Sequence, residues 1–225
     1  MSRSGRIAIV LGLFACAVVL VVFTAMSFVG TEPQTVSYLS SASGGRVHLV
    51  FQTDGAVGTG AHPTWVSYQV QTPRNHQWVH TTLVQLPAHT TVDVTIYQFD
   101  SGSPLRNQQF GMVTGTIGGT AKLDGKTFRV MNSNKALVGH TFTVPALGLN
   151  VPLKGVNTSK PGFCTSGPCN PSKQLHHTMT FSFKTPAPGN YHFQCFIPCG
   201  AGHYAGNGGP MQTEGYMGGF LEVRA

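Results

Sequence analysis

Hydrophobic residues along the chain form one long run near the N-terminus and many short runs after it. The long run covers residues 7–29, which carry no charge, and about 20 apolar residues are enough to cross a bilayer as a helix. Arg3 and Arg6 precede it, so the positive-inside rule leaves residues 1–6 in the cytoplasm and the rest outside. A cleaved signal peptide would have a shorter apolar region and a clearer small-residue site than residues 24–27 offer. We therefore predict a retained single-pass anchor in the cell membrane, with an extracytoplasmic C-terminal domain.

The short hydrophobic runs have the character of β-strands. They alternate between apolar and polar positions or are rich in Val, Thr, Phe and Tyr, and turn residues separate them. The predicted strands are 46–52, 65–71, 92–98, 113–117, 127–131, 178–184, 190–194 and 219–223. No stretch after residue 30 has the 3.6-residue period of an amphipathic helix, and residues 30–45 are a patternless polar linker. The pattern predicts an all-β Greek-key sandwich over residues 46–225.

Composition narrows the class of function. Charged residues make up 9% of the chain and only seven residues are carboxylates, which leaves no paired-carboxylate or Ser/His/Asp arrangement for a hydrolase. The net charge of +7 is spread thinly, without a Lys/Arg cluster, so we expect no nucleic-acid partner. The chain has no catalytic constellation of its own.

The cysteines differ in their surroundings. Cys16 lies in the apolar run and is expected to face lipid or another helix. Cys164 and Cys169 lie in a loop of turn residues, and exported thiols tend to oxidise, so we predict a disulfide between them. Cys195 and Cys199 could pair as well, unless a metal holds them as thiolates.

The segment from Cys195 to Met217 contains a run of soft metal donors. Cys195 and Cys199 are followed by His203, and Met211 and Met217 come next. Thiolate, imidazole and thioether together suit copper, whereas magnesium and calcium prefer oxygen and zinc makes little use of methionine. Predicted strands flank the segment on both sides, so it forms the loop between the last two strands and can hold a metal rigidly. The alternative is a Cys195–Cys199 disulfide in a structural β-domain without metal.

A second segment, Leu137–Gly148, places His140 far upstream of this loop. A distant histidine followed by Cys, His and Met between the last two strands resembles the cupredoxin family. The His140 segment and the spacing Cys-x3-Cys-x3-His are most like the CuA domain of cytochrome c oxidase subunit II, over roughly residues 85–225. The resemblance implies a dinuclear copper centre with both thiolates bridging.

The resemblance also implies a ligand set. The ligands are His140, Cys195, Cys199, His203 and the backbone carbonyl of Ile197. The family has its methionine three residues after the histidine, where this chain has Gly206. Met217 stands just before the final strand, as the family's methionine does, and Met211 is the competing candidate.

Other features depart from the family. Its common form has two membrane helices, and this chain has one. The family usually has an acidic residue shortly after its Pro-x-Leu-Gly stretch. In this chain residues 150–153 occupy that place, and none of them is acidic. The Trp-rich strand that usually receives electrons is represented only by residues 97–99.

A mononuclear type 1 copper site is the close rival. It would use His140, one cysteine, His203 and a weak axial methionine, in a geometry that favours one-electron transfer. In that interpretation Cys199 is the natural ligand and Cys195 stays a buried thiol. The remaining histidines carry no metal signal. Three lie in or beside predicted strands, where we expect surface or edge positions: His176, His177 and His192. The others are scattered through polar stretches: His48, His62, His76, His80 and His89.

The resulting expectation is a membrane-anchored carrier of single electrons. It resembles the electron-accepting subunit of a haem–copper terminal oxidase, which implies a soluble donor, a cytochrome c or another cupredoxin, and membrane oxidase subunits as acceptor. A thioredoxin-like copper chaperone would carry its cysteines at the start of a helix after the first strand. A thiol oxidoreductase would carry Cys-x-x-Cys, and neither pattern is present.

Overall fold

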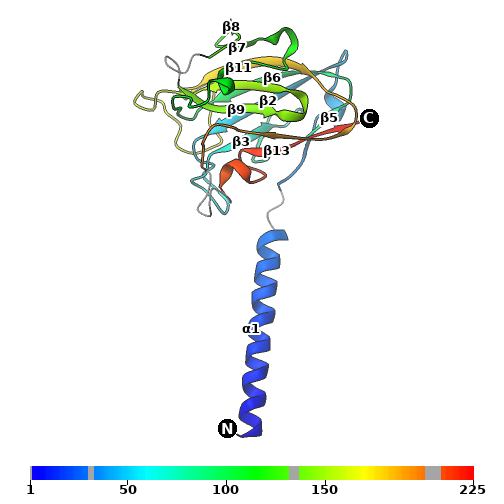
Figure 1. The fold of residues 1–225 in the computed structure, drawn as a ribbon, viewed down its shortest axis with the longest axis vertical. Coiled ribbons are helices and arrows are strands. Elements are labelled where there is room, and N and C mark those ends of the chain that lie inside the picture. Colours follow the sequence, from blue (N-terminus) through cyan, green and yellow to red (C-terminus); the bar gives the residue numbers. More distant parts are fainter. Residues whose placement is uncertain (1, 30–32, 132–136, 201–208) are drawn as a thin grey trace. The chain divides into compact units, whose positions relative to one another are not determined.

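The computed structural model describes residues 2–29, 33–131, 137–200 and 209–225. They belong to two units, Met1–Glu32 and Pro33–Ala225. The first contains helix α1 (Arg3–Val29), in which Ser4–Thr24 has a mean hydropathy of 3.0 (Figure 1). This helix is long and apolar enough to cross a membrane, whether as an anchor or as a signal sequence.

The second unit is a sandwich of two β-sheets (Figure 1). Among the described residues, the first sheet has the strand order β1 (Val36–Ser37), β5 (Leu83–Pro87), β13 (Gly218–Arg224), β12 (Gly189–Gln194), β9 (Val138–Val144), β10 (Leu149–Lys154). The second has the order β4 (Trp78–Val79), β3 (Ser67–Gln71), β2 (Arg46–Asp54), β6 (Thr91–Gln98), β11 (His177–Lys184), β7 (Ala121–Leu123), β8 (Lys126–Phe128). The pairs β1–β5, β5–β13 and β2–β6 are parallel and the others antiparallel. The predicted all-β sandwich after one N-terminal helix is confirmed.

Short 3-10 helices lie in the connections between strands. They are η1 (Leu39–Ser41), η2 (Gln108–Gly111), η3 (Ile117–Gly119), η4 (Pro145–Leu147) and η5 (Pro210–Gln212). Among the residues described after position 32 there is no longer helix, as the missing 3.6-residue period predicts.

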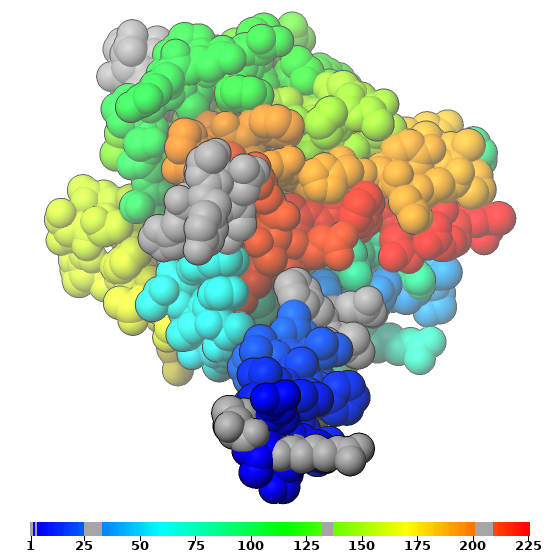
Figure 2. Space-filling model, turned by 60° about the horizontal axis from the view of Figure 1, so that its bottom comes forward, coloured from blue at the N-terminus to red at the C-terminus, as the bar shows by residue number. Residues whose placement is uncertain are grey.

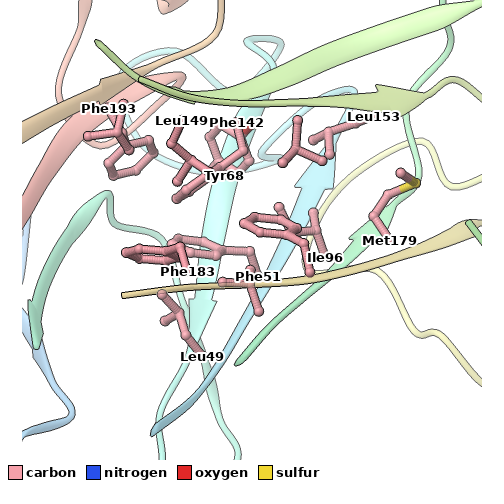
Figure 3. Close-up of a cluster of buried hydrophobic side chains, with 14 of the residues drawn as sticks. Leu49, Phe51, Tyr68, Ile96, Phe142, Leu149, Leu153, Met179, Phe183 and Phe193 are labelled. Carbon is pink, nitrogen blue, oxygen red and sulfur yellow. The ribbon is translucent and has the colours of Figure 1, made fainter. Parts of the chain in front are cut away.

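Side chains from both sheets meet in one apolar core (Figure 3). Every second side chain of β6 is buried, because successive residues of a strand point to opposite faces. The ring of Phe51 lies 5.7 Å from that of Tyr68, 5.5 Å from Phe142 and 5.9 Å from Phe193. Phe51 and Tyr68 belong to one sheet and the other two to its partner, and such ring pairs each contribute about 0.5–1.5 kcal/mol beyond their burial. These contacts therefore join the two sheets.

Two predicted strands are incorrect or shortened. The run 113–117 forms only isolated bridges and runs into η3, so the predicted strand is wrong. Gly115 adopts a φ of 69° and its α-carbon faces the backbone of Leu149, where a side chain would lie 2.6 Å from the nearest atom. The strand predicted at 127–131 ends at Phe128.

The sequence pattern also missed strands that are present. β9 and β10 are buried almost throughout, so they lack the alternation that marks a strand with one solvent face. β5 was missed as well, and β1 lies within the segment predicted as a linker, where it pairs with β5.

The first sheet brings distant segments of the chain side by side. β12 pairs with β13 through Gln194 and Gly218, and Gln194 also pairs with Thr143 of β9. The segment after β12 therefore leaves the sheet next to β9 and returns into β13. This confirms that residues 195–217 connect the last two strands, and it places Cys195 beside His140.

Candidate metal centre

His140 projects from β9 into the sandwich. Alternation along the strand places its side chain on the same face as Phe142, which is part of the core. The imidazole is 1% exposed. A fully buried imidazole needs partners for both ring nitrogens, since an unpaired buried polar atom is costly.

Cys195 is held at the end of β12 by hydrogen bonds from its own amide and from the next amide along the chain. Its amide donates to the carbonyl of Met217 at 2.9 Å, and the next amide, of Phe196, donates to Oγ1 of Thr141 at 2.9 Å. The side chain is fully buried, and its Sγ lies 3.5 Å from Nδ1 of His140. The two strands thus fix the thiol against the imidazole.

Cys199 completes a cluster of three donor atoms. The Sγ atoms of Cys195 and Cys199 and a ring nitrogen of His140 all lie within 4.8 Å of one another. Cys199 is half-buried, and it borders a cavity of about 550 Å³ that His140 and Pro210 also line. Among the described residues this is the cluster of His, Cys and acidic side chains that could hold a metal ion.

The two thiols of the cluster are not equivalent. Burial raises the pKa of Cys195, but hydrogen bonds with Cys199 and His140 and the charge of His140 outweigh it, so this pKa falls well below its ordinary value. The hydrogen bond to Cys195, together with burial, raises the pKa of Cys199. Before a metal binds, the pair therefore favours one thiolate, at Cys195, and one thiol, at Cys199.

The imidazole of His140 is charged in this arrangement. Burial lowers its pKa, but the hydrogen bond to Asp100 and the neighbouring Cys195 raise it to about 9. Nε2 of His140 donates to Oδ2 of Asp100 at 2.9 Å. Burial raises the pKa of Asp100, and the hydrogen bond and charge of His140 outweigh this and lower it. A metal at Nδ1 would replace the proton there and leave the Asp100 contact intact.

Asp100 is the residue that sequence reasoning missed. It lies two residues after the end of β6 and is one of only seven carboxylates in the chain. That scarcity was a usable signal, because a carboxylate in a chain this poor in them calls for a reason. Its contact with His140, however, joins residues forty positions apart and depends on the tertiary fold.

The other predicted ligands fall into three groups. The carbonyl oxygen of Ile197 lies 3.5 Å from Sγ of Cys195, within the loop. Met217 is fully buried in the same apolar cluster as Cys195, whereas Met211 is half-buried on η5. His203 lies outside the described residues. The structure thus brings His140, Cys195 and Cys199 together and leaves the choice of methionine open between Met217 and Met211.

Aromatic rings border the cavity on one side. Trp65 lines the cavity, stacks on His62 at 3.7 Å between ring centroids, and contacts Tyr216 at 5.0 Å. In Figure 2 the corresponding segment (cyan) adjoins the C-terminal segment (orange to red) at the surface. Tyr216 directly precedes Met217, which accepts the Cys195 amide. His62, which carries no metal signal in the sequence, therefore packs behind Trp65, a residue of the cavity wall.

The remaining cysteines and histidines of the described residues have other partners or surroundings. Cys164 and Cys169 form the predicted disulfide, with 6.1 Å between their α-carbons, and Cys16 is an exposed thiol on α1. His177 bonds to Asp124 at 2.8 Å, and the ring of His192 packs against Phe220. None of these residues joins the three-donor cluster within the described part of the chain.

Comparisons with known proteins find similarity in structure alone. No protein-family model matches the chain, and no curated protein matches it. Among solved structures, one described as the copper protein rusticyanin is 19% identical, with 86% of this chain and 85% of that one covered and a TM-score of 0.36. Rusticyanin from Thiobacillus ferrooxidans is 20% identical, with 86% and 84% covered and a TM-score of 0.35. A histidine-to-methionine variant of rusticyanin is 18% identical, with 86% and 85% covered and a TM-score of 0.35.

Proposed function

We propose that this protein is a copper-binding, cupredoxin-like carrier of single electrons, held at a membrane by α1. The observation that carries the proposal is the buried cluster of His140 Nδ1 with the sulfurs of Cys195 and Cys199, all within 4.8 Å. Imidazole and thiolate are ligands that copper prefers, and copper so held takes up and releases one electron at a time.

The chain's own residues hold Cys195 rigidly and exclude water from its sulfur. Cys195 is fixed by the Met217 carbonyl and, through Phe196, by Thr141. Phe193 and Met217 are fully buried in the apolar cluster that surrounds the thiol. Ligands that keep the same positions in both oxidation states need little rearrangement when the charge changes, and a dry shell tunes the potential. Zinc would also accept two thiolates and an imidazole, but it does not change oxidation state, so metal analysis and the visible spectrum distinguish the two metals.

A dinuclear centre is the form we favour. Two unpaired sulfurs lie close enough to share metal ions, and the Ile197 carbonyl beside Cys195 offers an oxygen ligand. His203, outside the described residues, and Met217 would complete the set that the CuA-like motif implies. In this form the protein would act as the electron-accepting subunit of a terminal oxidase.

A mononuclear site is the second candidate, and one observation favours it. The pKa of Cys195 is lowered while that of Cys199 is raised, so one thiolate forms more readily than two. Sequence reasoning gave Cys199 as the ligand of a mononuclear site. The 3.5 Å approach of Cys195 to Nδ1 of His140 instead supports Cys195.

The proposed partners are inferred from the apolar helix α1 and from the CuA-like motif. An anchor that holds the domain on the outer face of the cell membrane would keep it near membrane oxidase subunits and raise their effective concentration. The donor would be a soluble redox protein, either a cytochrome c or another cupredoxin. Support for these partners comes from the likeness of the motif segments to subunit II and from the apolar helix α1.

Electron paramagnetic resonance with metal analysis, on the full-length protein loaded with copper in detergent, tests the proposal. Hyperfine splitting shared by two copper nuclei would identify the dinuclear centre. Splitting from one nucleus, with an intense thiolate-to-copper absorption band, would identify the mononuclear one. Absence of bound copper, with Cys195 and Cys199 found oxidised in a thiol count under denaturing, non-reducing conditions, would leave a structural β-domain.

A further inference from the structure

Residues 100–103 form the turn after β6, and hydrogen bonds join this turn to β9 and to the segment after β10. Ser103 and Val138 exchange two backbone hydrogen bonds, at 3.1 and 3.0 Å, which pair the turn with the start of β9. The amide of Val156, beyond β10, donates to the carbonyl of Asp100 at 2.9 Å. The backbone of Asp100 is therefore placed relative to β9 without any help from the His140 side chain.

Glycines allow this close approach. A β-carbon on Gly139, the neighbour of His140, would lie 2.4 Å from the carbonyl oxygen of Ser101. One on Gly155 would lie 2.4 Å from the amide nitrogen of Gly102, and one on Gly102 would lie 2.9 Å from the backbone of Val138. Real β-carbons do not approach backbone atoms so closely, so larger residues would push the turn away from β9.

The carboxylate of Asp100 is oriented on both sides. Its Oδ1 accepts the amide of Ser101 at 2.6 Å, and its Oδ2 accepts Nε2 of His140 at 2.9 Å. Gly55 leaves room for it, because a β-carbon there would lie 2.9 Å from Oδ1. The acceptor that His140 meets is thus already in place before the imidazole binds anything.

Each ring nitrogen of His140 then has a distinct task. With Nε2 directed at Asp100, the Nδ1 atom faces Sγ of Cys195. A metal-bound imidazole is neutral and carries its one proton on the nitrogen that is not bound, and the partner of that proton fixes which nitrogen it is. We propose that Asp100 is a positioning residue of the metal centre, which holds the proton on Nε2 of His140 and thereby presents Nδ1 to the metal.

The inference rests on the proposed metal site, and it adds an electrostatic consequence. The negative charge of Asp100 next to the imidazole stabilises the more positive state of a bound metal. Removing the charge should therefore raise the reduction potential, and removing the acceptor as well should loosen the imidazole. An Asn at position 100 separates the two effects, because its amide oxygen can still accept from Nε2.

The experiment compares Asp100→Asn and Asp100→Ala with the wild type, using full-length protein loaded with copper. Loss of the partner of a metal-bound histidine costs about 10- to 100-fold in metal affinity. We expect a loss in that range for Asp100→Ala, a smaller loss for Asp100→Asn, and a higher reduction potential for both. In nitrogen-15 NMR spectra of the diamagnetic Cu(I) form, the protected Nε2–H signal of His140 should persist in Asp100→Asn and lose its protection in Asp100→Ala.

Two further variants sharpen the test. Asp124→Asn removes a carboxylate that bonds to another imidazole, that of His177, and should leave affinity and potential unchanged. Gly139→Ala keeps the carboxylate but displaces the turn, and should lower affinity as Asp100→Ala does. Should Asp100→Ala not fold, the potential of Asp100→Asn decides the matter.

The outcomes separate the two claims. If Asp100→Asn and Asp100→Ala both match the wild type in affinity and potential, the positioning role is refuted and the metal site stands. If the wild type itself binds neither copper nor the spectroscopic probe Co²⁺, the proposed function fails and the role of Asp100 fails with it.

Discussion

Two pairs of cysteines at similar spacing have different fates in this domain. Cys164 and Cys169 are five positions apart and form a disulfide, whereas Cys195 and Cys199 are four apart and remain thiols. Spacing in the sequence therefore does not separate a structural pair from a chemical one. The residues around each pair make that distinction.

Hydrogen bonds join the disulfide loop to β2 and to the residues that follow this strand. The amide of Cys169 donates to the side chain of Gln52 at 2.8 Å, and that of Gly167 to the carbonyl of Ala56 at 2.7 Å. The sulfurs pack with Phe99. At the other pair, an imidazole lies 3.5 Å from a thiol that a strand end holds in place. The first pair closes a loop, and the second places two sulfurs beside an imidazole, where we propose that a metal binds.

Removing a sulfur from the second pair should have the largest effect. Losing a direct thiolate ligand should cost more than losing its supporting partner, so Cys195→Ser should reduce copper affinity by more than about 100-fold. The thiolate-to-copper absorption band should disappear with it. A Cys195→Ser protein that kept the wild-type visible spectrum would show that Cys195 is not a ligand.

Cys199→Ser tells the two forms of the site apart. In a dinuclear centre it should abolish the signal as completely as Cys195→Ser does. In a mononuclear centre bound through Cys195 it should leave one copper with an altered spectrum. Cys16→Ser, in the exposed apolar helix, is the matched control and should change neither affinity nor spectrum.

Removing the disulfide should cost stability and spare the metal. A closed loop of this size contributes about 2 kcal/mol through the entropy of the unfolded chain, which corresponds to a lowering of Tm by roughly 4–8 °C for a domain this long. Cys164→Ala combined with Cys169→Ala should show that shift in calorimetry and keep the copper spectrum. Loss of the copper band in this variant would mean that the two regions are not independent.

A buried carboxyl beneath the disulfide loop should give a smaller, pH-dependent effect. Burial raises the pKa of Asp54 to about 7, although hydrogen bonds with Gln69 and a backbone amide oppose this. The folded pKa is above the unfolded one, so the folded state binds the extra proton. Stability from this group is full in acid and is lost as the pH rises through about 7.

The expected size of that effect follows from linkage. Between pH 6 and pH 8, Asp54 should lower the free energy of unfolding by about 1 kcal/mol. Asp54→Asn should lack this component when the two proteins are compared by urea unfolding, because contributions from all other groups cancel in the difference. Identical pH profiles for wild type and Asp54→Asn would contradict the assignment.

Local pattern was enough to predict part of the fold. β6 and β11 alternate cleanly because each has one face in the core and one outside it, and the sequence shows that period directly. β9 and β10 are buried on both faces, which removes the period. The predicted strand at 113–117 failed because a contact with Leu149 decides the conformation of Gly115. Only the tertiary fold contains that information.

The residues of the candidate site also fall into those that the sequence pattern indicates and those that depend on the tertiary fold. The loop cysteines and His140 could be singled out because soft donors in an exported chain are distinctive, and the fold brings them together. Their role as ligands, like that of His203, stays a prediction. The scarcity of carboxylates marks Asp100 as one of seven candidates, but its contact with His140 could not be predicted, because it requires a glycine-lined turn to lie against β9. Donor atoms are visible in a sequence, and the groups that orient them are not.

The position of β13 has a consequence for biogenesis. It lies inside the first sheet, between β5 and β12, although it is the last of the strands in chain order. Until it docks, β5 and β12 each expose an unpaired side, and the loop with Cys195 is anchored at one end only. During synthesis, Cys195 and Cys199 therefore emerge before β13, the strand that anchors the second end of their loop. In an oxidising compartment that interval would expose them to wrong pairing with Cys164 or Cys169, and a metal bound early would protect them.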